Sequence, residues 1–162
     1  MKTDLAIRQA EPLDRAALKD IIDSSFPRFF RFFAAHSVDS KEGKVLVGEE
    51  DDAVLGFAKL TDVHVADRKY GCILWLAVHP NHRREGIASA LVNAGVEELK
   101  RAGAGAVFAS VLRRNKASLA TFSGEGFKRV GFVGLWRLFG WRIFQFARRI
   151  WYAPGEVVVI HS

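Results

Sequence analysis

The sequence of 162 residues contains one cysteine, Cys72, so a disulfide framework within the chain is excluded. Cys72 lies in an apolar run, and we expect it to be a small buried hydrophobic residue in a protein of a reducing compartment. No stretch of about 18 uncharged apolar residues occurs, so we expect no membrane-spanning helix. Lys2, Asp4 and Arg8 interrupt any apolar stretch at the start. We therefore expect no signal peptide and a cytoplasmic location.

Internal repeats and low-complexity tracts are also missing, and no spacing of Cys and His residues suggests a metal site. We expect one domain over 1–162, with 49% hydrophobic residues to build its core. A net charge of +6 and a pI near 9.8 suit a protein that binds anions. Charge alone does not choose between coenzyme A, acidic lipids and RNA, and we predict no DNA partner.

The apolar periodicity predicts a mixed α/β chain with helices flanking one sheet. Strands are expected over 5–8, 45–48, 53–63, 72–78, 106–112, 127–134 and 156–160, and helices over 15–24, 29–37, 87–102 and 116–123. The acidic residues 49–52 form the turn of a hairpin. Asp14 is expected to cap the first helix, and Gly103 to end the third.

The most informative segment runs from Ile73 to Ala88, where an apolar strand stops at a proline and a helix begins after Gly86. Backbone N–H groups at a helix start have no intrahelical partner and lie at the positive end of the helix dipole, so they bind anions. The small residues leave room for phosphates, and Arg83 and Arg84 add charge-assisted hydrogen bonds. The segment therefore predicts a pyrophosphate-binding loop.

A second motif follows the strand at 106–112, where an asparagine leads a helix that ends in Gly-Phe. Together the two motifs and their spacing resemble the GNAT superfamily of acyl-CoA-dependent N-acetyltransferases, over about residues 5–134. The residues on the family's motif positions are Arg83, Gly86, Ala88, Asn115, Gly126 and Phe127. The resemblance implies the GNAT fold, in which a central, mostly antiparallel sheet flanked by helices is splayed between two parallel strands, here 72–78 and 106–112.

The resemblance also implies acetyl-CoA as co-substrate. In the family the pantetheine arm lies in the splay and pairs like an added strand, a role that falls here to Leu76 and Val78. Asn115 would hydrogen-bond the same arm, and it can also cap its helix. The residues predicted to bind the cofactor are Leu76, Ala77, Val78, Arg83, Arg84, Glu85, Gly86, Ile87, Ala88, Asn115 and Phe122.

Residues for proton transfer are fewer. Many family members have a tyrosine as general acid where this chain has Phe122, and N-terminal acetyltransferases often have a glutamate base where it has Ser110. A positioned acid contributes roughly 10²–10⁴ in rate, although a thiol with a pKa near ~8.5 leaves tolerably as an anion. We predict His64 as the base, and Ser123 as a donor through its hydroxyl or a water. A plain surface role stays open for both residues.

Two aromatic regions complete the pattern. Five phenylalanines between 26 and 33 occupy a region that commonly lines the acceptor pocket in the family. Clustered phenylalanines are usually core, but one helix face cannot bury five, so we expect some to face the acceptor or a partner.

The segment 135–152 departs from the family pattern. On one continuous helix over 135–151, its arginines share an arc with most apolar residues opposite. The polar residues of this arc are Arg137, Arg142, Gln145, Arg148 and Arg149. Such a helix could lie on a membrane surface, form the arm of a homodimer, cover the acceptor groove or pack on its own domain. We expect the homodimer in preference to the membrane surface.

These patterns predict an acetyl-CoA-dependent N-acetyltransferase. It would acetylate a primary amine on a hydrophobic or aromatic acceptor, which is a small molecule or a peptide, by direct attack in a ternary complex. One alternative is a GNAT domain that binds CoA with weak or no catalysis. The others are an aminoacyl-tRNA acyltransferase and a membrane-associated acyltransferase, with the basic aromatic segment contacting RNA or lipid.

Overall fold

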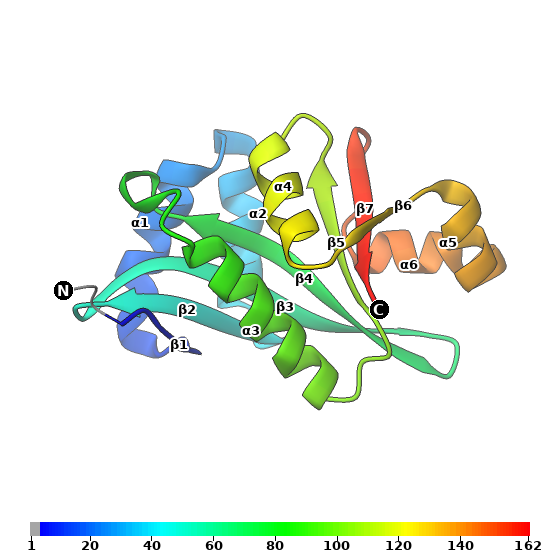
Figure 1. Ribbon diagram of the computed structural model, residues 1–162, viewed down its shortest axis with the longest axis horizontal. Helices are drawn as coiled ribbons and strands as arrows, with labels where there is room; N and C mark the ends of the chain where they lie inside the picture. The colour runs from blue at the N-terminus through cyan, green and yellow to red at the C-terminus, as the bar shows by residue number, and fades with distance from the viewer. Residues whose placement is uncertain (1–3) are drawn as a thin grey trace. The chain divides into compact units, whose positions relative to one another are not determined.

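The computed structural model describes residues 4–162, which form one mixed sheet with helices (Figure 1). The strand order is β1-β2-β3-β4-β5-β7-β6. The strands are β1 (Ala6–Gln9), β2 (Lys44–Glu50), β3 (Ala53–Val65), β4 (Arg68–Val78), β5 (Val107–Leu112), β6 (Lys128–Val130) and β7 (Glu156–His161). The helices are α1 (Arg15–Ser25), α2 (Arg28–Asp39), α3 (Ile87–Arg101), α4 (Lys116–Gly124), α5 (Phe132–Phe139) and α6 (Ile143–Arg149), with short 3-10 turns η1 (Pro12–Asp14), η2 (Pro80–His82) and η3 (Gly140–Arg142).

Strand pairing confirms the predicted fold class. β4 and β5 are parallel, with Gly71–Ile73 opposite Val107–Ala109. The pairs β1–β2, β2–β3, β5–β7 and β6–β7 are antiparallel. The parallel pairing covers only three residues of each strand, which is the splay expected between them. Within residues 4–162, none of the helices has the length and apolar character needed to cross a bilayer.

The chain divides into two compact units, each with its own core. Unit 1 comprises the described residues up to Leu60 together with Trp75–Gly95, and unit 2 comprises Thr61–Leu74 and Val96–Ser162. In unit 1 the apolar face of α1 packs against α2 and the strands β2 and β3. The fully buried residues of this core include Ile21, Ile22, Ala34, Val47 and Phe57.

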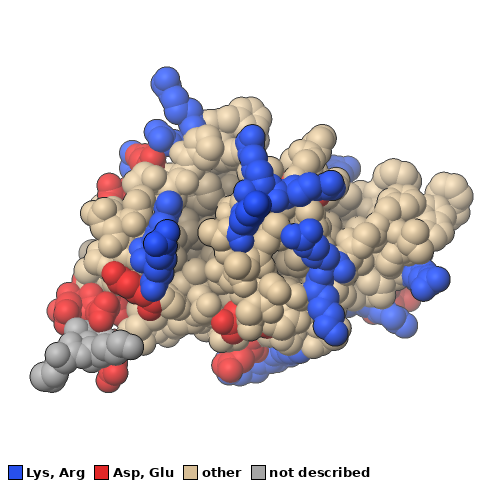
Figure 2. All heavy atoms as spheres, turned by 45° about the horizontal axis from the view of Figure 1, so that its top comes forward, with Lys and Arg blue, Asp and Glu red and all other residues tan. Residues whose placement is uncertain are grey.

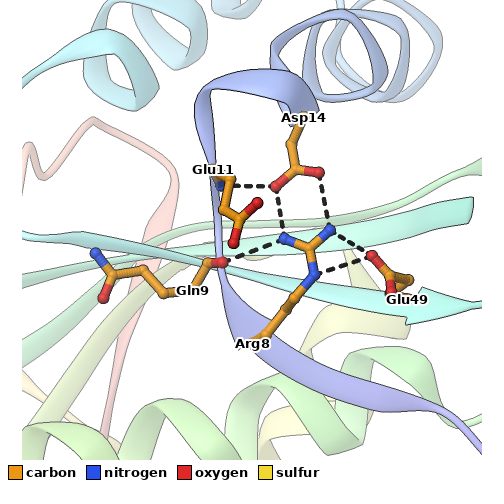
Figure 3. A network of polar contacts seen from close by, with 5 residues as sticks. All are labelled: Arg8, Gln9, Glu11, Asp14 and Glu49. Atoms are coloured by element: carbon orange, nitrogen blue, oxygen red, sulfur yellow. Dashed lines mark hydrogen bonds and ion pairs between the residues drawn. The ribbon is translucent and has the colours of Figure 1, made fainter. Parts of the chain in front are cut away.

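A polar network ties β1, η1 and β2 together in unit 1 (Figure 3). The guanidinium of Arg8 donates to both carboxylate oxygens of Asp14, at 2.7 and 2.9 Å, and its Nε donates to Glu49 at 2.9 Å. The N–H of Glu11 donates to Asp14 at 2.7 Å. The hydrogen bond from Arg8 is the main cause that lowers the pKa of Asp14. Asp14 stands at the predicted N-cap position of α1, but its side chain makes no capping bond there.

The core of unit 2 is aromatic, and the segment after β6 supplies much of it. Phe139 and Phe146 stack at 4.3 Å between ring centroids, and Phe146 also meets Phe108 on β5 at 4.7 Å. Cys72 lies in the same core, as predicted. Burial raises the pKa of its thiol to about 12, so the thiol stays protonated and inert.

Two predictions about the C-terminal third are wrong. The strand expected over 127–134 is only Lys128–Val130, because Gly131 stands at the N-cap position of α5 and the next residues are helical. The single helix expected over 135–151 is broken at Gly140, whose φ of +53° lies outside the helical region. The polar arc drawn on one helix therefore does not exist. The buried faces of α5 and α6 show that the segment packs on its own unit.

Candidate active site

The turn from β4 into η2 is fixed by backbone bonds in unit 1. The N–H of His79 donates to the carbonyl of Leu55 on β3 at 2.8 Å. Its Nδ1 accepts from the N–H of Asn81 at 3.3 Å, and Pro80 opens η2. The strand therefore ends at Val78, and the chain is directed toward the start of α3.

The start of α3 has the features of an anion site. The first residue of α3 whose N–H makes a helical hydrogen bond is Ala90, which donates to the carbonyl of Gly86 at 3.0 Å. The N–H groups of Ile87, Ala88 and Ser89 come earlier and have no carbonyl of the helix to bond. Arg83, Arg84, Glu85 and Gly86 are exposed beside them.

Backbone conformation sets the shape of this loop. Gly86 has a φ of +83°, and a side chain there would meet no protein atom within 4 Å, so the space in front of its Cα is open. Arg84 also has a positive φ, +68°, which is uncommon for a residue with a side chain and is typical of functional loops. The loop thus combines open space at Gly86, backbone donors at the start of α3 and two exposed arginines, which are features that suit a pyrophosphate.

The last residues of β4 meet the start of α3 over Gly56 on β3. A Cβ at Gly56 would lie 2.9 Å from the carbonyl oxygen of Ala77 and 3.2 Å from the side chain of Ile87. Leu76 is half-buried, Ala77 and Val78 are buried, and the hydroxyl of Ser25 donates to the carbonyl of Val78 at 3.3 Å. Sequence reasoning missed Gly56, because nothing in a strand glycine shows which backbone approaches it.

Four of the five phenylalanines, Phe26 directly after α1 and three on α2, divide into two groups in unit 1. Phe26 and Phe30 are half-buried and meet the ring of Trp75, which directly precedes Leu76 on β4, at 5.3 and 6.5 Å. Phe29 and Phe32 are 71% and 72% exposed. The cluster is therefore partly core and partly surface, as its size predicted.

In unit 2, Asn115 stands at the N-cap of α4, where its Oδ1 accepts from the N–H of Ser118 at 3.1 Å. The cap leaves its side-chain NH₂ group free to donate. Phe122 is buried and packs edge-on against Phe127 at 5.0 Å. Ser123 is exposed.

Three polar side chains come together beside β5 in unit 2, and two of them were missed. The hydroxyl of Ser110 donates to the carboxylate of Glu156 on β7 at 2.6 Å, and the N–H of Ala153 donates to the same carboxylate at 2.8 Å. The hydroxyl of Tyr152 lies 3.4 Å from the carbonyl of Glu156. Glu156 is the only acidic residue after Glu125, which is the signal that could have drawn attention to it.

His64 does not join this group. It is exposed on β3, on the face opposite the buried Val63 and Val65, and it lies near the start of β4, where Lys69 pairs with Asp62 at 3.1 Å. Ser110 follows the last β5 residue that pairs with β4. His64 therefore lies near Lys69, whereas Ser110 lies near Ile73. At about 3.3 Å per residue, the length of β4 from Lys69 to Ile73 is about 13 Å, so His64 and Ser110 are well separated.

Basic side chains are prominent on one face of the molecule. On the face shown in Figure 2, lysine and arginine side chains stand out from the surface. Within residues 4–162, no group of three or more His, Cys, Asp or Glu side chains is arranged to hold a metal ion.

A model of the acetyltransferase (GNAT) family matches residues 11–127. The chain belongs to this family. It is an acetyl-CoA-dependent N-acetyltransferase, and its predicted membership is confirmed. No curated protein matches its sequence.

Solved structures agree on the GNAT fold. A GNAT-family protein from Desulfovibrio desulfuricans is 19% identical with a TM-score of 0.73, and the match covers 97% of this chain and 96% of that one. The ribosomal-protein-S18-alanine N-acetyltransferase of Escherichia coli is 20% identical, with a TM-score of 0.64 and coverage of 97% and 91%. The protein yncA of Salmonella typhimurium, solved with its cofactor acetyl-CoA, is 24% identical, with a TM-score of 0.58 and coverage of 78% and 81%. At these identities the likeness shows the fold.

Proposed function

We propose that this GNAT enzyme acetylates a primary amine carried by a hydrophobic or aromatic acceptor, by direct attack on acetyl-CoA in a ternary complex. The proposed class of acceptor rests on one observation. The rings of Phe26 and Phe30 touch Trp75, next to the end of β4, while Phe29 and Phe32 remain exposed on α2. Exposed rings on α2 bind an apolar acceptor by burying its surface.

The proposed cofactor site begins at the start of α3. The free N–H groups there and the side chains of Arg83 and Arg84 would hold the pyrophosphate of CoA. Backbone groups of Leu76 and Val78 would pair with the pantetheine arm, and the NH₂ group of Asn115 would donate to it. The remaining proposed contacts with CoA are Ala77, Glu85, Gly86, Ile87 and Ala88. Phe122 is on the buried side of α4, so we propose that it supports the site by packing.

We propose that Glu156 is the general base for the attacking amine and that Ser110 relays the proton to it. The attacking amine nitrogen forms a bond to the thioester carbon, and its proton passes to the Ser110 oxygen as the Ser110 proton passes to Glu156. The carbon–sulfur bond then breaks, and the thiolate leaves. Support comes from the 2.6 Å bond between Ser110 and Glu156, which puts a carboxylate beside the position where related enzymes carry a glutamate. Ser123 and Tyr152 are the hydroxyl groups proposed to protonate the thiolate.

Calorimetry with CoA tests the cofactor site. Gly86→Val should abolish binding, because it fills the open space before the helix and strains a positive φ. Arg84→Ala should weaken binding by about 1.5–3 kcal/mol, the range for a charged hydrogen bond. Gly124→Ala is the control, since a Cβ there also meets no atom within 4 Å and the residue lies in α4. Unchanged affinity in the Gly86 variant would end the assignment.

Kinetics with aromatic and polar amines test the acceptor and the base. We expect a higher kcat/KM for an aromatic amine such as phenylethylamine than for a polar diamine, and a loss of this preference in Phe29→Ser. Glu156→Gln should lower kcat by about 10²-fold at unchanged CoA affinity, since glutamine keeps the bond from Ala153 but takes up no proton. His64→Ala is the comparison variant. If it removes the acidic limb of the pH profile while Glu156→Gln does not, His64 is the base and the Glu156 assignment is wrong.

A further inference from the structure

The surface of α5, η3 and α6 has an apolar composition that is unusual for the outside of a protein. The inward face of these elements is anchored in unit 2, where Phe139, Ile143, Phe146 and Ile150 are buried. The outward face carries large apolar side chains, of which Trp141 is 81% exposed and Phe144 is 69% exposed. The other exposed members of this surface are Phe132, Val133, Trp136, Leu138 and Trp151. We call these residues the aromatic ridge.

The ridge is ordered by contacts between its own rings. Phe132 lies 6.0 Å from Trp136, and Trp136 meets Trp141 edge-on at 5.0 Å. The first contact lies within α5, and the second joins α5 to η3 across the break at Gly140. A cluster held on both short helices, with the opposite face buried in a core, presents its apolar side chains without the cost of ordering them on binding.

The segment that carries the ridge has charged side chains of one sign only. The sequence between Glu125 and Glu156 contains six lysine and arginine residues and no aspartate or glutamate. Four of them, Arg137, Arg142, Arg148 and Arg149, lie in or beside the two helices and are exposed. Within residues 4–162, none of these four arginines forms an ion pair. The surface thus combines large apolar side chains with uncompensated positive charge.

We propose that the aromatic ridge and its arginines dock this enzyme on the anionic surface of a lipid bilayer. Tryptophan and phenylalanine insert at the boundary of headgroups and acyl chains, and arginine binds anionic headgroups, so the two properties are complementary to one partner. A second copy of the chain fits less well. A two-fold interface sets the same patch against itself, and this patch brings arginines together with no acid of its own to neutralise them. RNA would use the arginines and stack on the rings, but it offers nothing for the exposed Val133 and Leu138.

Vesicle sedimentation tests the proposal on the whole protein. Wild-type protein should sediment with vesicles of mixed phosphatidylglycerol and phosphatidylcholine at low salt, and much less with phosphatidylcholine alone. The double variant Trp141→Ser, Phe144→Ser should weaken binding by at least about tenfold, because one fully buried large apolar side chain corresponds to roughly one order of magnitude in the binding constant. The substitution Arg148→Gln with Arg149→Gln should weaken it on the charged vesicles only.

Matched controls separate this surface from exposure or charge in general. Phe32→Ser removes an equally exposed ring on α2, and the pair Arg113→Gln, Arg114→Gln removes two exposed arginines outside the segment. Both should bind like wild type. Equal loss in the controls, or equal binding by the Trp141 and Phe144 variant, would overturn the assignment to this surface.

A second measurement needs no variant. Tryptophan emission of the wild-type protein should shift to the blue on anionic vesicles and be quenched by bromine-labelled acyl chains, because Trp136 and Trp141 enter the headgroup boundary. No binding and no quenching at low salt would refute the proposal. Light scattering that shows a dimer in solution, dissociated by the Trp141 and Phe144 substitutions, would assign the ridge to a second copy. RNA binding lost in the same variant, with no vesicle binding, would assign it to RNA.

Discussion

Gly56 shows how a single residue without a side chain shapes the cofactor region of unit 1. Its Cα faces the carbonyl of Ala77 at the end of β4 and the side chain of Ile87 at the start of α3. Those two backbone segments are the ones proposed to hold pantetheine and pyrophosphate. A methyl group at this position forces one of them to move, since 2.9 Å to a carbonyl oxygen is shorter than real Cβ contacts.

We expect Gly56→Ala to weaken CoA binding by at least about tenfold and to lower the melting temperature, because overpacking against backbone costs roughly 1–3 kcal/mol. Calorimetric titration with CoA and thermal unfolding measure the two effects. Gly105→Ala is the matched control, since the nearest atom to its Cβ lies 3.8 Å away. Wild-type affinity in the Gly56 variant would show that the end of β4 plays no part in binding.

At the same scale, sequence reasoning could identify what the site lacks but not what replaces it. Phe122 and Ser110 were recognised from their distance to Asn115 along the chain, a local relation that survives in the structure. The carboxylate beside Ser110 comes from Glu156, 46 residues later, and the contact exists because Ser110 pairs with Val158, two residues beyond Glu156 on β7. Strand register of this kind is set by the whole sheet, so no motif reports it.

At the start of α4, one residue, Asn115, has a structural role and a proposed binding role. Asn115 caps the helix through its Oδ1, and its NH₂ group is proposed to bind pantetheine. We expect Asn115→Asp to keep the cap and the stability of the protein while weakening CoA binding, because the carboxylate accepts from Ser118 but donates nothing. Asn115→Ala should lose binding as well as about 1 kcal/mol of unfolding free energy.

Urea denaturation and CoA titration on both variants distinguish these roles. A variant with aspartate that binds CoA like wild type would leave the cap as the only function of Asn115. A variant with alanine that unfolds like wild type would show instead that the cap contributes little.

In the segment after β6, the helices and strands could not be predicted correctly from the sequence. Helices α1 to α3 have clear apolar periodicity and α4 begins directly after its asparagine cap, and the predicted and observed ranges of all four differ by at most two residues. Residues 130–136 are all apolar or glycine and show no clear period, so the pattern of Phe and Val around Gly131 looks equally like a strand and like a helix start. The turn at Gly140 then depends on packing, because Phe139 and Phe146 must both reach the core of unit 2. Tertiary contacts, rather than local preference, decide this part of the chain.

For the molecule as a whole, two motifs were enough to predict the family, while the acceptor, the base and the partner depend on contacts between distant segments. The division into two compact units was not predicted either, since β3, β4 and α3 each run through both units. One of the polar contacts that hold unit 1 together is the Arg8 network, which joins β1 to η1 and β2.

This network should make the folded protein less stable as the pH falls, because of the Asp14 carboxyl. Its pKa is lowered in the folded protein, first by the hydrogen bond from Arg8, and the group is buried. A carboxyl with a lowered folded pKa contributes stability that is fully present above its unfolded pKa, near ~3.9, and is lost as the pH falls through the folded value. We expect Asp14→Asn to lose roughly 1.5–3 kcal/mol of unfolding free energy at neutral pH, the range for charged hydrogen bonds, and the gap to wild type to close below about pH 4.

Urea unfolding of both proteins between neutral and acidic pH measures this gap. Asp23→Asn is the control, because Asp23 pairs with Lys19 at the surface, where solvent screens the pair, and its removal should change little at any pH. A gap between wild type and Asp14→Asn that stays constant down to the acid transition would mean that Asp14 acts through packing and not through its charge. A gap that closes as described would make the Arg8 network a source of acid lability in this enzyme.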